Sequence, residues 1–188
     1  MEVNSKLRFV TLLSETNRSG VEKLLEWLDK TNFYTSPAST KYHGAVEGGL
    51  LAHSLAVYDE LLKVNAAFCL EIKPESMVIT ALLHDLNKAN FYTVSERNVK
   101  NDAGVWEKVP YYTIDDQLPM GHGEKSVILL QAFIRPTIEE IMAIRWHMGA
   151  FGSESYADRQ ALTGAMDKYP IIVALQIADM ASVYFGKK

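Results

Sequence analysis

Apolar residues recur every three or four positions through most of this 188-residue chain, and this spacing constrains the fold more than any other feature. It predicts helices, because only a helix brings residues at that spacing onto one face. Two helices are expected between residues 4 and 32, followed by helices at about 49–70, 74–87, 123–134, 136–147, 158–168 and 170–185. The predicted class is therefore all-α.

Two of these helices show the pattern clearly. Leu7, Val10 and Leu13 are expected to form the buried face of the first helix. The helix at about 49–70 carries apolar or aromatic residues on its expected inward face at Leu51, Leu55, Tyr58 and Leu62.

One segment breaks the helical pattern. Between residues 91 and 115, "YTVSERNV" and "VWEKVPYYT" are rich in β-branched and aromatic residues and flank the turn-like "KNDAG". We expect a small β-hairpin inserted among the helices. Since no Pro/Gly/Ser-rich linker divides the chain, residues 1–188 are expected to form a single domain.

Charge and composition argue against several kinds of partner and compartment. A net charge of −4 and a pI of about 5.7 give no general attraction to nucleic acid or anionic membranes. We find neither a signal peptide nor an apolar run long enough to span a membrane. The single cysteine, Cys69, excludes an intrachain disulfide and fits a reducing compartment, so a cytoplasmic location is expected.

The stretch "ITALLHDLNKANFY" carries the first indication of chemistry. Its apolar run ends on adjacent His84 and Asp85, with Lys88 one helical turn further on. The other histidines each fall near an end of a predicted helix, where side chains from separate helices can converge: His43, His53, His122 and His147. These residues are therefore candidates for one shared site.

Two aspartates strengthen this interpretation. Asp179 lies in "IIVALQIADMASV", where Gln176 is the other strongly polar residue, and Asp85 ends a second apolar helix. A carboxylate in such a position is costly to bury unless it is hydrogen-bonded, paired or bound to a cation. For either aspartate taken alone, hydrogen bonds from backbone amides or an ion pair with an arginine would be a sufficient explanation. Together with the histidines, a metal site explains both.

The order of these residues resembles a known family. The pattern H…HD…H…H…D is formed by His53, His84, Asp85, His122, His147 and Asp179, and it resembles the HD superfamily of metal-dependent phosphohydrolases in its binuclear form. The flanking sequences "GGLLAHSL", "ALLHDLNK", "GHGEKS", "IRWHMGAF" and "ALQIADM" are similar to the HD domain of YhaM-type 3′–5′ exoribonucleases and to stand-alone HD hydrolases of bacteria and their phages. The resemblance implies an HD-domain helical bundle with its core at about residues 41–185.

The same resemblance implies a ligand set for two divalent transition metal ions. The first ion would be held by His53, His84, Asp85 and Asp179, and the second by His122 and His147 with Asp85 bridging. Imidazole and carboxylate ligands without thiolate suit Mn, Fe, Co, Ni or Zn, and the sequence does not choose between them. Two ions in such a site activate a water for attack on phosphorus.

Asp85 and Lys88 are the expected catalytic residues. The Lys88 ammonium would bind a phosphate oxygen beside the metals, although a solvated lysine at a helix end is the alternative. Asn87 stands where the family often has glycine. Three further residues are candidate substrate contacts or, alternatively, ordinary solvent-exposed side chains: His43, Lys125 and Arg145.

Three functions are consistent with these features. The first is hydrolysis of a phosphoester in a nucleotide or another small phosphorylated substrate. The second is 3′–5′ exonuclease activity on single-stranded RNA or DNA, for which the hairpin aromatics would stack a base. The third is a non-catalytic HD regulatory module. The same aromatics alternatively indicate packing or a homo-oligomer contact.

Overall fold

Helices dominate the structure, as the apolar spacing predicts. The computed structural model describes residues 2–41, 44–152 and 155–185, and these residues form eight α-helices and one two-stranded antiparallel sheet. The helices are α1 (Glu2–Glu15), α2 (Val21–Leu28), α3 (Gly49–Phe68), α4 (Pro74–Leu83), α5 (His122–Gln131), α6 (Ile138–Trp146), α7 (Tyr156–Lys168) and α8 (Ile171–Tyr184). The strands are β1 (Tyr92–Lys100) and β2 (Trp106–Ile114), and two 3₁₀ turns are η1 (Leu86–Lys88) and η2 (Gly149–Gly152).

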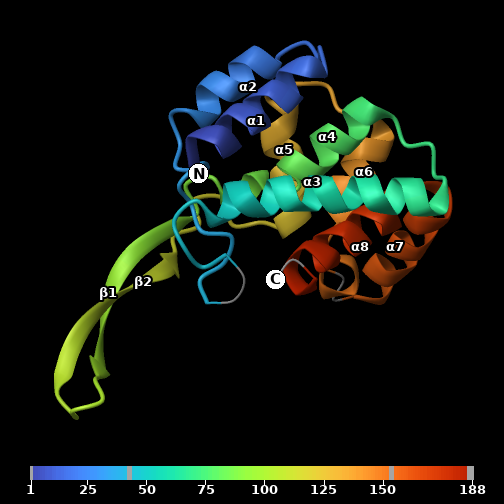
Figure 1. Ribbon diagram of the computed structural model, residues 1–188. Coiled ribbons are helices and arrows are strands. Elements are labelled where there is room, and N and C mark those ends of the chain that lie inside the picture. The colour runs from blue at the N-terminus through green and yellow to red at the C-terminus, as the bar shows by residue number, and fades with distance from the viewer. Residues whose placement is uncertain (1, 42–43, 153–154, 186–188) are drawn as a thin grey trace.

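The long helix α3 organises the helical body. It crosses the middle of Figure 1, with α1 and α2 on one side and α7 and α8 on the other. It packs against α8 and α4, while α5 packs against α6. No helix within the described residues is long and apolar enough to cross a membrane.

Two apolar clusters hold these helices together. The first joins α1, α2, α4 and the first half of α3, and contains Phe9, Leu24 and Leu82. The second joins the later part of α3 to α4, α6, α7 and α8, and contains Leu61 and Leu175. Both clusters contain residues of α3 and α4. The helix that carries His53 and the helix that His84 follows are therefore each packed against both clusters.

The predicted inward faces need two corrections. Leu7 is 63% exposed, and Phe9 is fully buried in its place, where its ring packs 5.4 Å from that of Phe33. Leu62 is 38% exposed, and the neighbouring Leu61 is fully buried instead. Sequence spacing indicates that a helix has an apolar face, but the rotation of that face depends on the helices that pack against it.

The helix that delivers the His-Asp pair is shorter than predicted. It ends at Leu83, and His84 follows it with helical φ and ψ of −58° and −36°. Asp85 then adopts φ −101° and ψ 24°, and Leu86–Lys88 form a 3₁₀ turn in which the Lys88 N–H donates to the Asp85 carbonyl. The chain thus changes from α-helix to a tighter 3₁₀ turn directly after His84 and Asp85, which places both residues at the end of α4.

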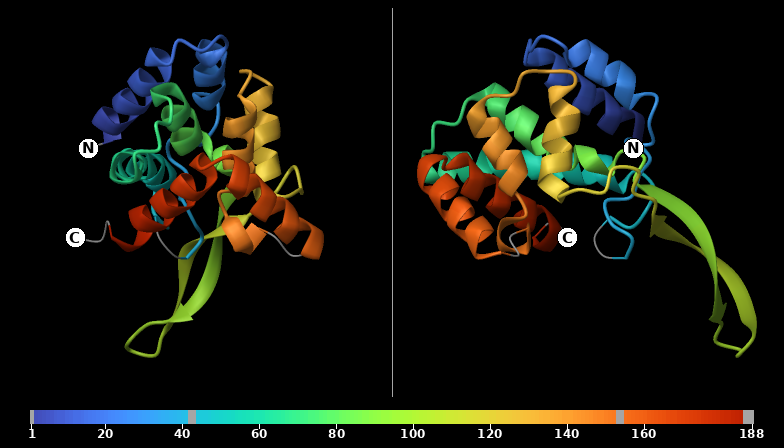
Figure 2. Two further views of the ribbon diagram at one scale, coloured as in Figure 1. Left: turned by 90° about the vertical axis from the view of Figure 1, so that its right-hand side faces the viewer. Right: turned by 180° about the vertical axis from the view of Figure 1, so that it is seen from behind.

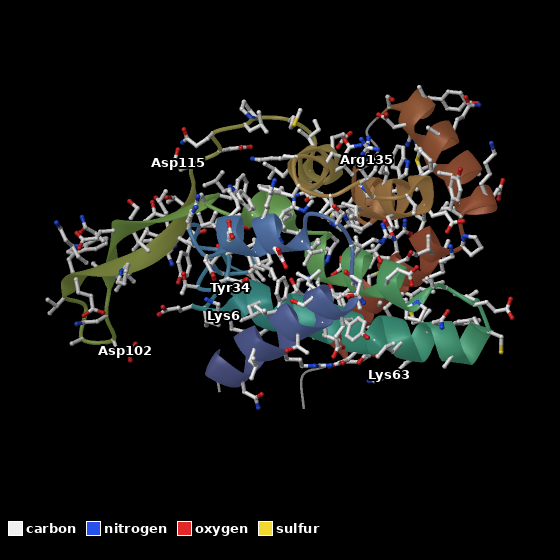
Figure 3. All side chains as sticks on the ribbon, turned by 90° about the horizontal axis from the view of Figure 1, so that it is seen from above. Lys6, Tyr34, Lys63, Asp102, Asp115 and Arg135 are labelled. Atoms are coloured by element: carbon white, nitrogen blue, oxygen red, sulfur yellow. The ribbon has the colours of Figure 1, made fainter. Side chains whose placement is uncertain are left out.

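The predicted hairpin is confirmed and projects away from the helices. Tyr92 pairs with Ile114 at its base and Lys100 with Trp106 near its tip. Figures 1 and 2 show the two strands as an arm extending beyond the helical body. The labels of Asp115 and Asp102 in Figure 3 mark its base and its tip.

A buried carboxylate joins three distant segments. Glu140, which is fully buried, accepts hydrogen bonds at Oε1 from Arg18 Nη2 at 2.5 Å and from Ser76 Oγ at 2.7 Å. Its Oε2 accepts from the Thr137 N–H at 2.8 Å, and the Glu140 N–H donates to Thr137 Oγ1 at 3.2 Å. Glu140 thus caps α6 and ties it to α4 and to the α1–α2 connection.

Candidate metal centre

Four histidines and two aspartates from different parts of the chain meet at one place. His53 lies on α3, His84 and Asp85 follow α4, His122 begins α5, His147 follows α6, and Asp179 lies on α8. His53, His84, Asp85 and His147 are buried. Side chains from five helices that are far apart in the sequence therefore lie close together.

The ligand atoms form two overlapping groups. His53 Nε2 lies 3.3 Å from His84 Nε2 and 3.2 Å from Asp179 Oδ1, and one ligand atom from each of these residues lies within 4.8 Å of the others. A second group with the same spacing comprises His84, Asp85 and His147. The first group contains three of the four ligands expected for one ion. The second group contains His147 and Asp85, as expected for the other ion, but its third member is His84 and not His122.

Backbone hydrogen bonds fix two of the imidazoles in the ligand tautomer. His84 Nδ1 lies 2.8 Å from the Ala81 carbonyl, and His147 Nδ1 lies 2.7 Å from the Ile144 carbonyl. A carbonyl only accepts, so both Nδ1 atoms carry a proton, and in the neutral form of each ring Nε2 offers a lone pair. His147 Nε2 is buried and has no hydrogen-bond partner among the described residues. An orphaned lone pair of this kind fits a metal ion.

His122 is held differently, through Asn87. His122 Nε2 lies 2.7 Å from Asp85 Oδ1, and its Nδ1 lies 2.8 Å from the Asn87 amide nitrogen. Ser126 Oγ donates to Asn87 Oδ1 at 3.0 Å and accepts from the Asn87 backbone N–H at 3.1 Å. With the amide nitrogen toward it, His122 carries its proton on Nε2 and donates to Asp85.

Turning the Asn87 amide over would present its oxygen to Nδ1 and release His122 Nε2 as a ligand. Ser126 can complement either orientation, because a hydroxyl both donates and accepts. Asn87 therefore orients a candidate ligand, a role that the sequence did not suggest. The one available signal was an amide side chain where the resembled family often has glycine.

Lys88 lies beside the shared carboxylate, as its sequence position predicts. Its Nζ donates to Asp85 Oδ2 and to the Ala38 carbonyl, both at 2.7 Å. Burial lowers the pKa of Lys88, but the charge and hydrogen bond of Asp85, together with the nearby Tyr92 and Asp179, outweigh burial and raise that pKa overall. The ammonium is therefore charged and held at the edge of the candidate metal site.

Charge pairing governs the protonation of the cluster. Burial raises the pKa of Asp85, yet Lys88 and His84 outweigh it and hold that pKa well below the ordinary range. Asp179 behaves similarly, since the hydrogen bond from His53 helps to lower its pKa to about 2 in spite of burial. Burial lowers the pKa of His147, which favours the neutral ring. Ionised carboxylates and neutral imidazoles are the forms that bind metal.

A pocket of about 270 Å³ opens onto these groups. Its polar wall is formed by His53, Asp85, Lys88, His122, His147 and Asp179. Its remaining wall is apolar and consists of Met148, Phe151, Met180, Val183 and Tyr184. A small molecule can therefore reach the candidate ligands from solvent.

Two of the remaining candidate substrate contacts, Lys125 and Arg145, do not line this pocket. Lys125 is 6% exposed, forms an ion pair with Asp116 and lies 4.8 Å from the centre of the Phe91 ring. Arg145 forms a 2.5 Å ion pair with Glu124 in a neighbouring pocket that shares His122. His43 lies outside the described residues. Both described cations are therefore already paired with carboxylates outside the pocket that opens onto the candidate ligands.

Comparisons with known proteins do not assign a family. A scan against protein-family models, a search of curated proteins and a search of solved structures each gave no match. The structure thus shows buried histidine and aspartate side chains whose ligand atoms are close enough together to hold a metal ion.

Metal affinity is expected to fall as the pH is lowered from about 8 to about 6. Burial lowers the pKa of His84, but Asp85 and Asp179 outweigh it and raise the pKa above the ordinary histidine value. A raised pKa keeps the ring protonated to higher pH, and a protonated Nε2 cannot bind metal. Calorimetric titration with Mn²⁺ in buffers of different ionisation enthalpy should show proton release on binding. Affinity that is constant over this pH range would contradict histidine ligation.

Proposed function

We propose that this protein is an HD-type metal-dependent phosphohydrolase that cleaves a phosphoester of a nucleotide or a similar small substrate. The observation that carries the proposal is the meeting of imidazole Nε2 atoms and two ionised aspartates at the floor of an open pocket. A lysine ammonium held 2.7 Å from one of these carboxylates adds a site for a phosphate oxygen.

The candidate ligands fall into two sets in this proposal. One ion would be held by His53, His84, Asp85 and Asp179, and a second by His122 and His147, with Asp85 shared between them. Bound divalent ions supply a water of lowered pKa and polarise the phosphoryl group. Asp85 belongs to both proposed sets because its Oδ1 lies 2.7 Å from His122 Nε2, whereas its Oδ2 lies 3.4 Å from His84 Nε2.

Lys88 is proposed to bind the phosphoryl group of the substrate. An ammonium has three N–H donors, and Asp85 and the Ala38 carbonyl use two of them. The third is available for a phosphoryl oxygen on which negative charge builds during attack. Ala38 and Asp85 hold the ammonium in place, so little ordering is needed when the substrate binds.

The pocket chemistry favours a substrate with one phosphoryl group in the site. Lys88 is the one lysine or arginine among the described residues that line the pocket. A triphosphate would bring several further negative charges, and the nearby Arg145 is already paired with Glu124. The apolar wall suits a flat or apolar group attached to the phosphate, as a nucleoside would provide.

The test of this proposal is elemental analysis followed by a hydrolysis screen. Purified protein should contain transition metal, and added Mn²⁺, Co²⁺ or Ni²⁺ should support hydrolysis of an aryl phosphate, an aryl phosphodiester or common nucleotides. Release of phosphate or of mononucleotide identifies the bond that is cleaved. A protein without metal affinity and without turnover would instead be a non-catalytic module.

Replacing Lys88 with alanine is expected to leave metal content unchanged and to lower kcat about 10²–10³-fold, as the loss of one donor to a developing oxyanion typically does. Metal analysis and steady-state kinetics measure the two effects. The matched control is Lys63→Ala, which removes an exposed lysine on α3. Unchanged turnover in Lys88→Ala would remove Lys88 from the mechanism.

Replacing His122 or His147 with alanine is expected to remove one metal ion and to leave the other bound. The reason is that His53 and Asp179 belong to the group that neither histidine joins. Elemental analysis of each variant after dialysis gives the stoichiometry. Two ions per chain in either variant would show that the assignment of the second ion is wrong.

A further inference from the structure

A second groove lies at the base of the hairpin, where it faces the segment before α3. This hairpin groove has a volume of about 380 Å³, within the range of small-molecule sites. Its walls come from the segment at Thr40, Lys41 and Ala45 and from the strands at Val94, Arg97, Pro110, Tyr111 and Tyr112. The metal-centre pocket shares none of these residues.

The charge of the hairpin groove is opposite to that of the whole protein. Lys41 and Arg97 line it, and no carboxylate does so among the residues that the structure describes. Neither cation forms an ion pair within the described residues, whereas Lys108 on the same hairpin pairs with Glu96 at 3.4 Å. In a chain of net charge −4, two uncompensated cations in one groove favour an anionic ligand.

The groove also offers aromatic surface beside these charges. The Arg97 guanidinium lies 5.2 Å from the centre of the Tyr111 ring, and Tyr111 and Tyr112 are each half-buried at the groove wall. A guanidinium on an aromatic ring binds phosphate with its edge, while an aromatic face accepts a nucleobase by stacking. The two features together match an anion that carries a flat ring.

Ala38 connects this groove to the metal centre. Its carbonyl accepts from Lys88 Nζ at 2.7 Å and from the Tyr92 hydroxyl at 3.5 Å. Thr40 lies two residues after Ala38, and Val94 lies two residues after Tyr92. Each groove wall therefore begins two residues along the chain from the contact between Tyr92 and Ala38, and the Ala38 carbonyl also accepts from Lys88.

We propose that the hairpin groove binds one nucleotide unit, with its phosphoryl group at Lys41 and Arg97 and its base against Tyr111. The unit comes either from a free nucleotide or from an oligonucleotide whose end lies in the metal-centre pocket. The site goes beyond the proposed phosphohydrolase activity, because binding in the groove requires neither metal nor turnover.

The test is fluorescence anisotropy on the full chain after metal removal. The probes are fluorescein-labelled AMP and a labelled single-stranded RNA of about six nucleotides. Arg97→Gln and Tyr111→Leu are each expected to weaken binding about tenfold, the size of one lost stacking or phosphate contact. Lys108→Gln is the matched control, since Lys108 lies on the same hairpin outside the groove and pairs with Glu96.

The two probes distinguish the source of the nucleotide unit. Variant-sensitive binding of AMP identifies a free nucleotide, and variant-sensitive binding of RNA alone identifies an oligonucleotide. The proposal is overturned if neither probe binds, or if Arg97→Gln and Tyr111→Leu bind as Lys108→Gln does. Hydrolysis of an aryl phosphodiester by metal-loaded protein is measured separately. Absence of nucleotide binding in the groove and absence of the proposed activity are therefore seen in different assays.

Discussion

Replacing Asp85 with alanine is expected to abolish metal binding and hydrolysis together, with activity at least about a thousandfold lower. Asp85 is the carboxylate that His122, His147 and Lys88 all approach, at 2.7, 3.6 and 2.7 Å. Its loss removes a ligand of the proposed site and leaves the Lys88 ammonium without its counter-charge. Elemental analysis and the hydrolysis assay on the same sample measure both effects.

Two control variants distinguish the loss of the Asp85 charge from a general effect on folding. Asp85→Asn keeps the side-chain volume but removes the charge and one of the two acceptor oxygens, so it should fold and still fail to bind metal. Asp59→Ala removes a half-exposed carboxylate that pairs with Arg8 on the surface, and it should bind metal normally. Asp85→Ala protein that retained metal and activity would refute the shared-ligand role.

Replacing Glu140 with alanine is expected to lower the free energy of unfolding by roughly 3–5 kcal/mol, the usual cost of removing one partner of a buried ion pair. Glu140 is fully buried, and Arg18 and Ser76 both donate to it. The substitution also removes half of the capping box at Thr137. Urea denaturation monitored by circular dichroism provides the measurement.

Glu139→Ala is the matched control, because Glu139 lies in the same first turn of α6 but is exposed. Glu139→Ala should change the free energy of unfolding by no more than about 0.5 kcal/mol. Equal effects of the two substitutions would show that the contacts of Glu140 with Arg18 and Ser76 add nothing beyond helix propensity. Because Ile144 and His147 follow on the same segment, a loss of order at α6 should also weaken metal binding.

The sequence predicted the helices well because their signal is local. Apolar spacing located all eight helices of the described residues to within a few positions, and the break in that spacing located the hairpin. The six candidate ligands were also named from sequence, through their order and their neighbouring motifs. Their convergence in space agrees with that prediction, while their activity remains a proposal.

Side-chain partners were much less predictable. Lys125 and Arg145 each neighbour a candidate ligand in sequence, yet Asp116 and Glu124 pair with them. Both partners are carboxylates that sequence distance alone does not single out. The role of Asn87 was missed for the same reason, since it depends on His122, 35 residues away.

The sequence by itself therefore determined the helical class, the inserted hairpin and the residue types available for a metal site. Short-range periodicity and residue chemistry are sufficient for these features. The tertiary structure decided which imidazole nitrogens donate to backbone carbonyls, which cations are already paired and which carboxylate lies between Lys88 and the histidines. These depend on packing between α3, α4, α5, α6 and α8, because a hydrogen bond or ion pair forms only when two side chains come within about 3–4 Å.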